Sequence, residues 1–336
     1  MTANAAQSST RTEHDSLGAI EVPTEAYYGV HTARAVHNFP ISGTPIGATP
    51  HLVRALATVK LAAATANLEL GLLAEHKASA IVRACEDIID GDLHEQFVVD
   101  SIQGGAGTST NMNANEVIAN RALEHLGEPR GSYHVVHPLD DVNLGQSTND
   151  VYPTAIKLAL HWSITELLAA LGDLRQAFTA KAAEFHDIIK IGRTQLQDAV
   201  PMTLGQEFGA FGVTIGEDEQ RLDEARELLH ELNLGGTAIG TRLNAAPGYQ
   251  DLALEALRAR TGITTLISAP DLVESTQDTG AFVQLSGVIK RVAVKLSKIC
   301  NDLRLLSSGP LAGLGEINLP PVQAGSSIMP GKVNPV

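Results

Sequence analysis

The sequence predicts an all-α protein with an N-terminal helical domain and a central bundle of long helices. Aromatic residues make up only 4% of the chain while Ala, Leu and Val dominate, a composition that favours helices packed on helices. Three segments in the second half repeat apolar residues at helical spacing over long stretches. We therefore expect a disordered N-terminus over residues 1–14, a helical domain over 15–148 and the bundle over 149–336.

Three shorter helices are expected in the N-terminal domain, over residues 51–73, 77–89 and 115–126. Leu52, Leu56 and Val59 illustrate the helical spacing of the first. Two loops rich in small polar residues interrupt the domain, over residues 103–115 and 137–150. These loops are the first candidates for a functional site.

The bundle is expected to contain helices over residues 152–190, from 203 onward, and over 276–306. Asn149 or Asp150 is expected to cap the first, with Pro153 in its first turn. The third helix alternates apolar steps of three and four, which is typical of a coiled-coil seam. Such long stripes cannot all be buried in one monomer, so we expect a homo-oligomer. The alternative is an elongated monomeric rod, which would need only short turns between helices.

Composition excludes several classes of function. A net charge of −14 argues against nucleic acid as a partner, because phosphate binding needs a surplus of Lys and Arg. Cys85 and Cys300 lie far apart without metal-ligand spacing, so neither a disulfide framework nor a zinc site is expected. Residues 1–14 lack the apolar core of a signal peptide, and no apolar run approaches about 18 residues. A cytoplasmic protein without membrane contact is expected.

Four segments hold more small polar residues than turns require. Residues 103–113 place glycines before a helix, an arrangement that aims backbone N–H groups at an anion, although the P-loop lysine is missing. Residues 146–150 exceed what a helix cap needs, and residues 192–201 exceed a tight turn. Residues 325–335 form a Gly-flanked segment in which Lys332 can meet a carboxylate. A flexible connector, a simple cap and a turn with a surface arginine are the alternatives for the first three.

In this order, the four segments resemble the aspartase/fumarase superfamily, and the run Gly-Ser-Ser-Ile-Met-Pro-Gly-Lys-Val-Asn-Pro at 325–335 is similar to its signature. The resemblance covers residues from about 15 to the last. It implies homotetramers whose active sites are each built from three subunits, and a C-terminal domain that is absent from this chain. These 336 residues expressed alone are therefore expected to be poorly soluble or inactive, because apolar stripes would be exposed.

Several positions favour the ammonia-lyases of this superfamily over its class II fumarases. The run Ala-Tyr-Tyr-Gly-Val-His-Thr at 26–32 and the run Gln-Gly-Gly-Ala-Gly at 103–107 are similar to aspartases. Gln195 stands where fumarases place a histidine, and an amide cannot exchange protons near neutral pH. The resemblance thus implies elimination of ammonia from L-aspartate to give fumarate. A class II fumarase and a non-catalytic helical scaffold are the alternatives.

The resemblance also implies roles for individual residues. Ser326 is the base that removes a proton from Cβ of the substrate, helped by Ser327. The resulting aci-carboxylate, with two negative charges, would be bound by Thr194, Gln195, Lys332 and Asn334. The other carboxylate and the amine would be held by Thr108, Ser147, Thr148 and Asn149. No cofactor is expected to be required and no metal ligands are assigned, although Mg²⁺ activates some aspartases.

Two positions depart from the family pattern. Leu139 replaces the usual Asn, which puts an accessory dicarboxylate site in doubt, and Arg242 replaces the usual Gly. His134 and His137 have no third ligand nearby in sequence and are interpreted as structural or solvent-facing.

Overall fold

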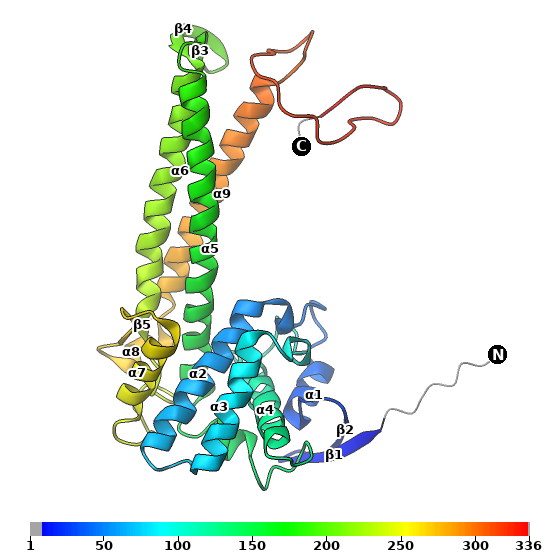
Figure 1. Cartoon of the computed structure of the whole chain (residues 1–336), viewed down its shortest axis with the longest axis vertical. Coiled ribbons are helices and arrows are strands. Elements are labelled where there is room, and N and C mark those ends of the chain that lie inside the picture. Colours follow the sequence, from blue (N-terminus) through cyan, green and yellow to red (C-terminus); the bar gives the residue numbers. More distant parts are fainter. Residues whose placement is uncertain (1–8, 335–336) are drawn as a thin grey trace, which may run out of the picture. The chain divides into compact units, whose positions relative to one another are not determined.

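The computed structural model describes residues 9–334, which divide into two compact units (Figure 1). The first unit combines the described residues up to Ile164 with Arg226–Thr279, and the second combines Thr165–Ala225 with the residues from Gly280 onward. Residues 149–164 and 226–279, expected in the bundle, therefore group with the N-terminal part. The reason is that helix α7 (Tyr249–Thr261) packs against α2 (Pro50–Glu69).

The first unit is a layered helical core. Its helices are α1 (Val30–Asn38), α2, α3 (Glu75–Asp90), α4 (Thr108–His125), α7, α8 (Leu272–Gln277) and the first turns of α5 (Thr148–Glu184). Helix α3 packs on both α2 and α4. Fully buried side chains such as Leu56, Ile81 and Ile118 fill the space between them. The first two expected helices are confirmed, whereas the third, expected from 115, begins at Thr108.

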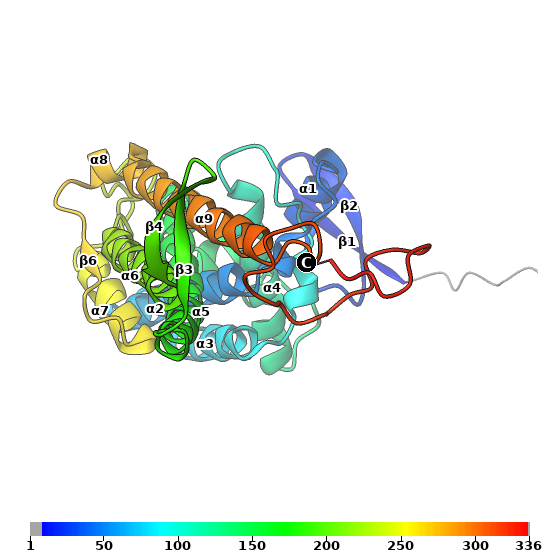
Figure 2. The same ribbon diagram turned by 90° about the horizontal axis from the view of Figure 1, so that it is seen from above.

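The second unit contains the remainder of α5 together with α6 (Leu204–Glu227) and α9 (Gly280–Leu306) (Figures 1 and 2). Phe178 of α5 stacks edge-on against Phe211 of α6 at 5.5 Å between ring centroids. On α9 the buried residues recur every seventh position, at Leu285, Val292, Ile299 and Leu306. This spacing confirms one half of the expected seam.

Three helix boundaries differ from expectation. The first long helix ends at Glu184, not 190. The second ends at Glu227, where a 3₁₀ turn (Leu228–His230) follows. The third is divided into α8 and α9, and Asp271 caps α8 by accepting hydrogen bonds from two backbone N–H groups of its first turn. Helix caps and strand pairing thus set the helix ends, which apolar spacing alone did not predict correctly.

Three short two-stranded sheets were not expected. Strands β1 (Thr10–Asp15) and β2 (Gly18–Pro23) are antiparallel, as are β3 (Ile189–Thr194) and β4 (Gln197–Thr203), whereas β5 (Glu231–Leu232) and β6 (Ile267–Ser268) are parallel. The expected disorder over 1–14 is wrong for 10–14, because Glu13 of β1 accepts a 2.8 Å hydrogen bond from the Val30 N–H. Residues 1–8 lie outside the described residues.

Within the described range, one helix, α5, is long and apolar enough to cross a membrane by length and composition alone. Its Leu158 and Phe178 are almost completely buried inside the protein. Arg175 on the same helix forms a 2.9 Å ion pair with Glu219 of α6. Of its most apolar stretch, 33% is buried inside the protein.

Candidate active site

The first unit brings two helix N-termini together at residues that the sequence singled out. Gly107 precedes α4 with a φ of 92°, and a Cβ on it would lie 2.1 Å from a ring carbon of Tyr152 on α5. The Asn111 side-chain amide donates to Thr148 Oγ1 at 3.2 Å. The start of α4 at Thr108 therefore lies against the start of α5. Because helix N-termini carry partial positive charge, two of them side by side favour the binding of an anion.

The first turn of α5 is closed by a reciprocal cap. Ser147 Oγ accepts from the Asn149 N–H at 3.2 Å, while Asp150 accepts from the Ser147 N–H at 3.0 Å. Ser147 is thus the capping residue, rather than Asn149 or Asp150 as expected. Pro153 lies inside the helix and has no backbone N–H to donate to the carbonyl of Asn149, four residues earlier. The Asn233 side chain donates to that carbonyl instead, at 3.0 Å.

Hydrogen bonds already present decide which of these polar groups can serve a ligand. Thr148 and Ser147 accept through their hydroxyl oxygens, which leaves their O–H groups able to donate to a carboxylate. Thr108 Oγ1 instead donates to the Gly105 carbonyl at 2.7 Å. Asn149 donates one amide N–H to the Ala238 carbonyl at 2.7 Å, which fixes the orientation of its side chain.

Beneath these residues lies a buried polar network that the sequence analysis missed. Asn143 Oδ1 accepts three hydrogen bonds, from Lys60 Nζ at 2.8 Å, from Asn111 at 3.1 Å and from Asn115 at 3.2 Å. Lys60 is fully buried, and burial lowers its pKa to about 7. Burial likewise raises the pKa of Asp150 to about 6. A lysine within the apolar run of the first predicted helix was the signal available in the sequence.

The second unit holds the other predicted site residues. Thr194 and Gln195 stand exposed at the tip of the β3–β4 hairpin, where Thr194 pairs with Gln197. The expected loop over 192–201 is therefore wrong, because its residues form this hairpin. Gln195 and Leu196 occupy the two-residue turn with φ of 53° and 64°. That conformation normally selects Asn and Gly, so strain is stored at the tip.

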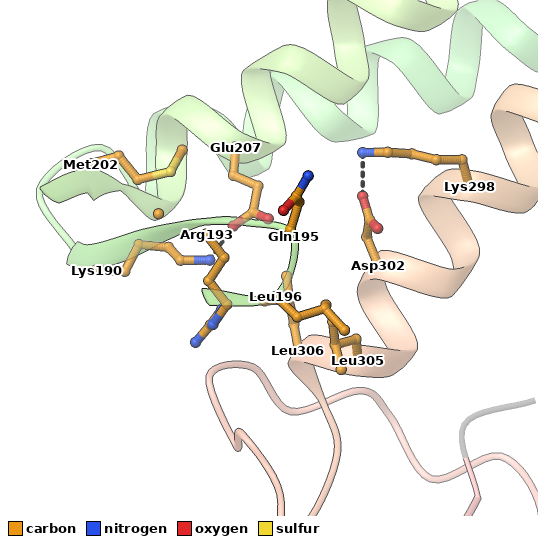
Figure 3. A pocket seen from close by; sticks show the side chains of 11 residues that line it. Lys190, Arg193, Gln195, Leu196, Met202, Glu207, Lys298, Asp302, Leu305 and Leu306 are labelled. Atoms are coloured by element: carbon orange, nitrogen blue, oxygen red, sulfur yellow. Dashed lines mark hydrogen bonds and ion pairs between the residues drawn. The ribbon is translucent and has the colours of Figure 1, made fainter. Parts of the chain in front are cut away.

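A cavity of about 330 Å³ lies beside this tip (Figure 3). Figure 3 shows Lys190 of β3 and Glu207 of α6 pointing toward each other next to Gln195. The α9 side of the cavity is lined by Lys298, Asp302, Leu305 and Leu306. Its lining thus mixes charged groups of both signs with leucines.

The signature segment folds back on itself. Gly325 and Lys332 are joined by a 2.8 Å backbone hydrogen bond, and the Asn334 side chain donates to the Gly325 carbonyl at 3.3 Å. Ser326 is half-buried, and its Oγ accepts from the backbone N–H groups of Ile328 and Met329, both at 3.3 Å. Ser327 and Lys332 are exposed. Two N–H groups directed at one hydroxyl oxygen favour its deprotonated form.

The two departures from the family pattern have different surroundings. Leu139 is 40% exposed in a π-helical turn (Pro138–Val142) and lines a cavity of about 210 Å³. The ring of His137 caps this turn, and His134 is exposed, which agrees with their structural interpretation. Arg242 adopts a φ of 62°. Glycine takes this conformation without steric cost, which explains why glycine is usual there. Across the described part of the chain, no three His, Cys, Asp or Glu side chains gather as metal ligands.

The chain therefore combines long packed helices with a pair of helix N-termini and a serine-bearing segment at 325–335. A family profile described as "Lyase" matches residues 18–336. The chain belongs to the aspartase/fumarase superfamily.

Curated relatives and solved structures agree with this assignment. The chain is 65% identical to "Aspartate ammonia-lyase" of Pseudomonas aeruginosa, over 98% of its own length and 69% of the relative. It is 55% identical to the Escherichia coli protein of the same name, over 97% of its length and 68% of that relative. Its fold matches the "fumarate lyase:delta crystallin" of Brucella melitensis bound to cobalt (TM-score 0.95, 63% identity, 97% of this chain and 71% of that one). The class II fumarase of Schistosoma mansoni matches with a TM-score of 0.92 and 38% identity, at the same coverage.

Proposed function

We propose that the protein eliminates ammonia from L-aspartate to give fumarate. Curated relatives that are 55–65% identical over nearly the whole chain are named aspartate ammonia-lyase. The structural observation that carries the proposal is the pair of N–H groups aimed at Ser326 Oγ, because a serine acts as a base only when its oxyanion is stabilised.

Substrate binding is assigned to the paired helix N-termini. The α-carboxylate and the amine meet Thr108, Ser147, Thr148 and Asn149, and the hydroxyls of Ser147 and Thr148 are ready to donate. The chain as a whole carries a charge of −14, which repels a dicarboxylate. The partial charges of two helix ends act at short range, where they outweigh this screened repulsion.

Chemistry is assigned to the signature segment and the hairpin tip. The Ser326 alkoxide takes the proton from Cβ, and the electron pair moves into the adjacent carboxylate to form the aci-carboxylate. Thr194, Gln195, Lys332 and Asn334 donate hydrogen bonds to this dianion, with Ser327 assisting. The electron pair then returns to form the C=C bond as the C–N bond breaks, and the α-ammonium leaves as neutral ammonia. Binding the intermediate more tightly than the substrate is what accelerates the reaction.

Assembly, cofactors and compartment belong to the same proposal. We propose a homotetramer in which three subunits contribute to each active site. Apolar seam residues of α9 that are not buried within the unit, such as Ile289 at 41% exposure, support a helix bundle shared between subunits. We propose that no cofactor is required. Mg²⁺ is proposed only as an activator, and no step is assigned to it. The proposed compartment is the cytoplasm.

Replacing the base is the direct test. In the enzyme expressed from its complete gene, Ser326→Ala should lower fumarate formation from aspartate by about 10³-fold. Helix content and oligomeric state should stay unchanged. Ser79→Ala, a matched change at an exposed serine of α3, should leave the rate unchanged. Wild-type activity in Ser326→Ala would refute the base assignment, and faster fumarate formation from malate than from aspartate would favour the fumarase alternative.

A further inference from the structure

A cluster of four charged residues lies at the base of the hairpin that carries Thr194 and Gln195. Glu316 Oε2 lies 2.8 Å from Lys190 Nζ, and its other carboxylate oxygen binds Arg193. Lys190 also binds Glu207 of α6. Two cations of β3 are thus joined to one carboxylate of α6 and one from the segment after α9. Figure 3 shows three of these side chains beside Gln195.

The cluster is partly removed from water and balanced in charge. The Lys190 side chain is only 9% exposed, and those of Glu316 and Arg193 are 20% and 21% exposed. The Arg193 hydrogen bond lowers the pKa of Glu316, so its carboxylate is charged near neutral pH. Removing one member leaves a partly buried charge without its partner, which is far more disruptive than losing a surface pair.

The backbone of Glu316 is anchored to the end of α9. Its backbone N–H donates to the Leu306 carbonyl, at the last residue of α9, at 2.9 Å. The carboxylate therefore extends from a fixed point at the helix end to β3. Ten residues further along the chain the same segment reaches Ser326, the proposed base.

The hairpin requires such support because its geometry is irregular and strained. Pairing shifts register between Ile191 and Arg193. A Cβ on Gly192 would lie 3.0 Å from the sulfur of Met202. The bulge redirects the strand immediately before the tip, and at the tip Gln195 and Leu196 have positive φ. Strained conformations of this kind persist only where surrounding contacts hold them.

We infer that Glu316 is a positioning residue for the elimination reaction, fixing the hairpin tip with Thr194 and Gln195 relative to the end of α9. This inference rests on the proposed function of those two residues. Glu316 touches no substrate in this assignment. It acts through Arg193 and Lys190, which hold the strand that presents the two donors.

The test compares Glu316→Gln with Glu217→Gln in the enzyme expressed from its complete gene. Glu217 is a matched carboxylate of α6, 61% exposed and 3.1 Å from Lys295. Glu316→Gln should lower kcat by about 100-fold while KM changes less than about threefold, because misplaced donors weaken binding of the intermediate more than that of the substrate. Glu217→Gln should keep kcat within about twofold.

A second variant and a second readout keep the outcome decisive. Glu316→Asp retains the charge and should fold normally, yet it is one methylene shorter and should lower kcat by about tenfold. Hydrogen exchange of the backbone amides at 194–197 should accelerate about tenfold in Glu316→Gln and not in Glu217→Gln. Unchanged kcat in Glu316→Asp, or unchanged exchange in a folded Glu316→Gln, would overturn the inference.

Failure of the inference and failure of the proposed function give different results. An inactive wild-type enzyme would refute the function, while the exchange experiment would still report whether Glu316 holds the hairpin. An active wild-type enzyme with a fully active Glu316→Gln variant would refute only the positioning role.

Discussion

The two groups of proposed site residues are held in place by different physical means. In the first unit, Thr148 and its neighbours rest on a buried network of amides and one lysine, centred on Asn143 Oδ1. In the second unit, Thr194 and Gln195 stand on a strained hairpin tied down by ion pairs around Glu316. The residues proposed to bind the ground state thus rest on a hydrogen-bonded network built on a fully buried lysine, whereas those proposed to meet the extra charge of the intermediate are held by partly exposed ion pairs.

The largest expected effect tests whether the first scaffold depends on Asn143. Asn143→Ala removes the acceptor of three hydrogen bonds from buried side chains, so it should destabilise the fold by about 3–6 kcal/mol. Urea unfolding measures this change. Asn301→Ala, at an exposed position of α9, is the matched control and should cost less than about 0.5 kcal/mol. A loss below about 1 kcal/mol for Asn143→Ala would show that the network is not essential.

The next test separates binding from chemistry. Thr148→Val removes a donor used equally in the substrate and the intermediate, so KM should rise about tenfold with little change in kcat. Gln195→Asn keeps an amide and tolerates positive φ but reaches less far, so kcat should fall about tenfold with little change in KM. Steady-state kinetics with aspartate measures both. If the two variants gave the same pattern, the proposed division of labour would be wrong.

A smaller effect is expected in the pH dependence of stability, because the fully buried Lys60 of the first scaffold has a lowered pKa. The pKa of Lys60 falls from 10.5 to about 7 on folding, so the folded state binds fewer protons between these values and stability should rise with pH across that window. Asp150 has the opposite sign: its pKa rises from 3.8 to about 6, so its contribution is present below pH 3.8 and is lost by about pH 6. Melting temperatures measured from pH 7 to 9 should rise in the wild type and less steeply in Lys60→Met.

The smallest expected effect tests whether backbone strain contributes to function only in the hairpin turn. Arg242 in the first unit also has positive φ, so Arg242→Gly should stabilise the protein by up to about 1 kcal/mol. The same change at Arg260, in the last turn of α7, should destabilise it by about 0.5–1 kcal/mol. Thermal unfolding measures both changes in stability. A more stable Arg242→Gly variant with an unchanged kcat would show that strain at Arg242 has no role in catalysis, in contrast to the turn at Gln195.

Periodicity predicted the helical fold and the order of its elements, since apolar spacing at Leu56, Ile81 or Leu285 reflects burial along a single helix. The proposed site residues were found through polar residues in excess of capping needs, as at 146–150. The β3–β4 hairpin was missed because the turn at Gln195 and Leu196 lacks the usual Asn-Gly signal. Lys60 and Glu316 were missed because their partners lie 83 and 123–126 residues away in sequence, and single-chain patterns do not encode such pairings.

The contact between Gly107 and Tyr152 has a consequence for how the two helix starts combine their charge. Since a ring carbon would lie 2.1 Å from any added Cβ, the aromatic ring occupies the space that a side chain would need. One tyrosine ring thus serves as the spacer between two positive helix ends, and their attraction for a carboxylate is felt as a single field. A side chain at position 107 would push the ring and the two helix starts apart, and the field that they share would weaken with the distance.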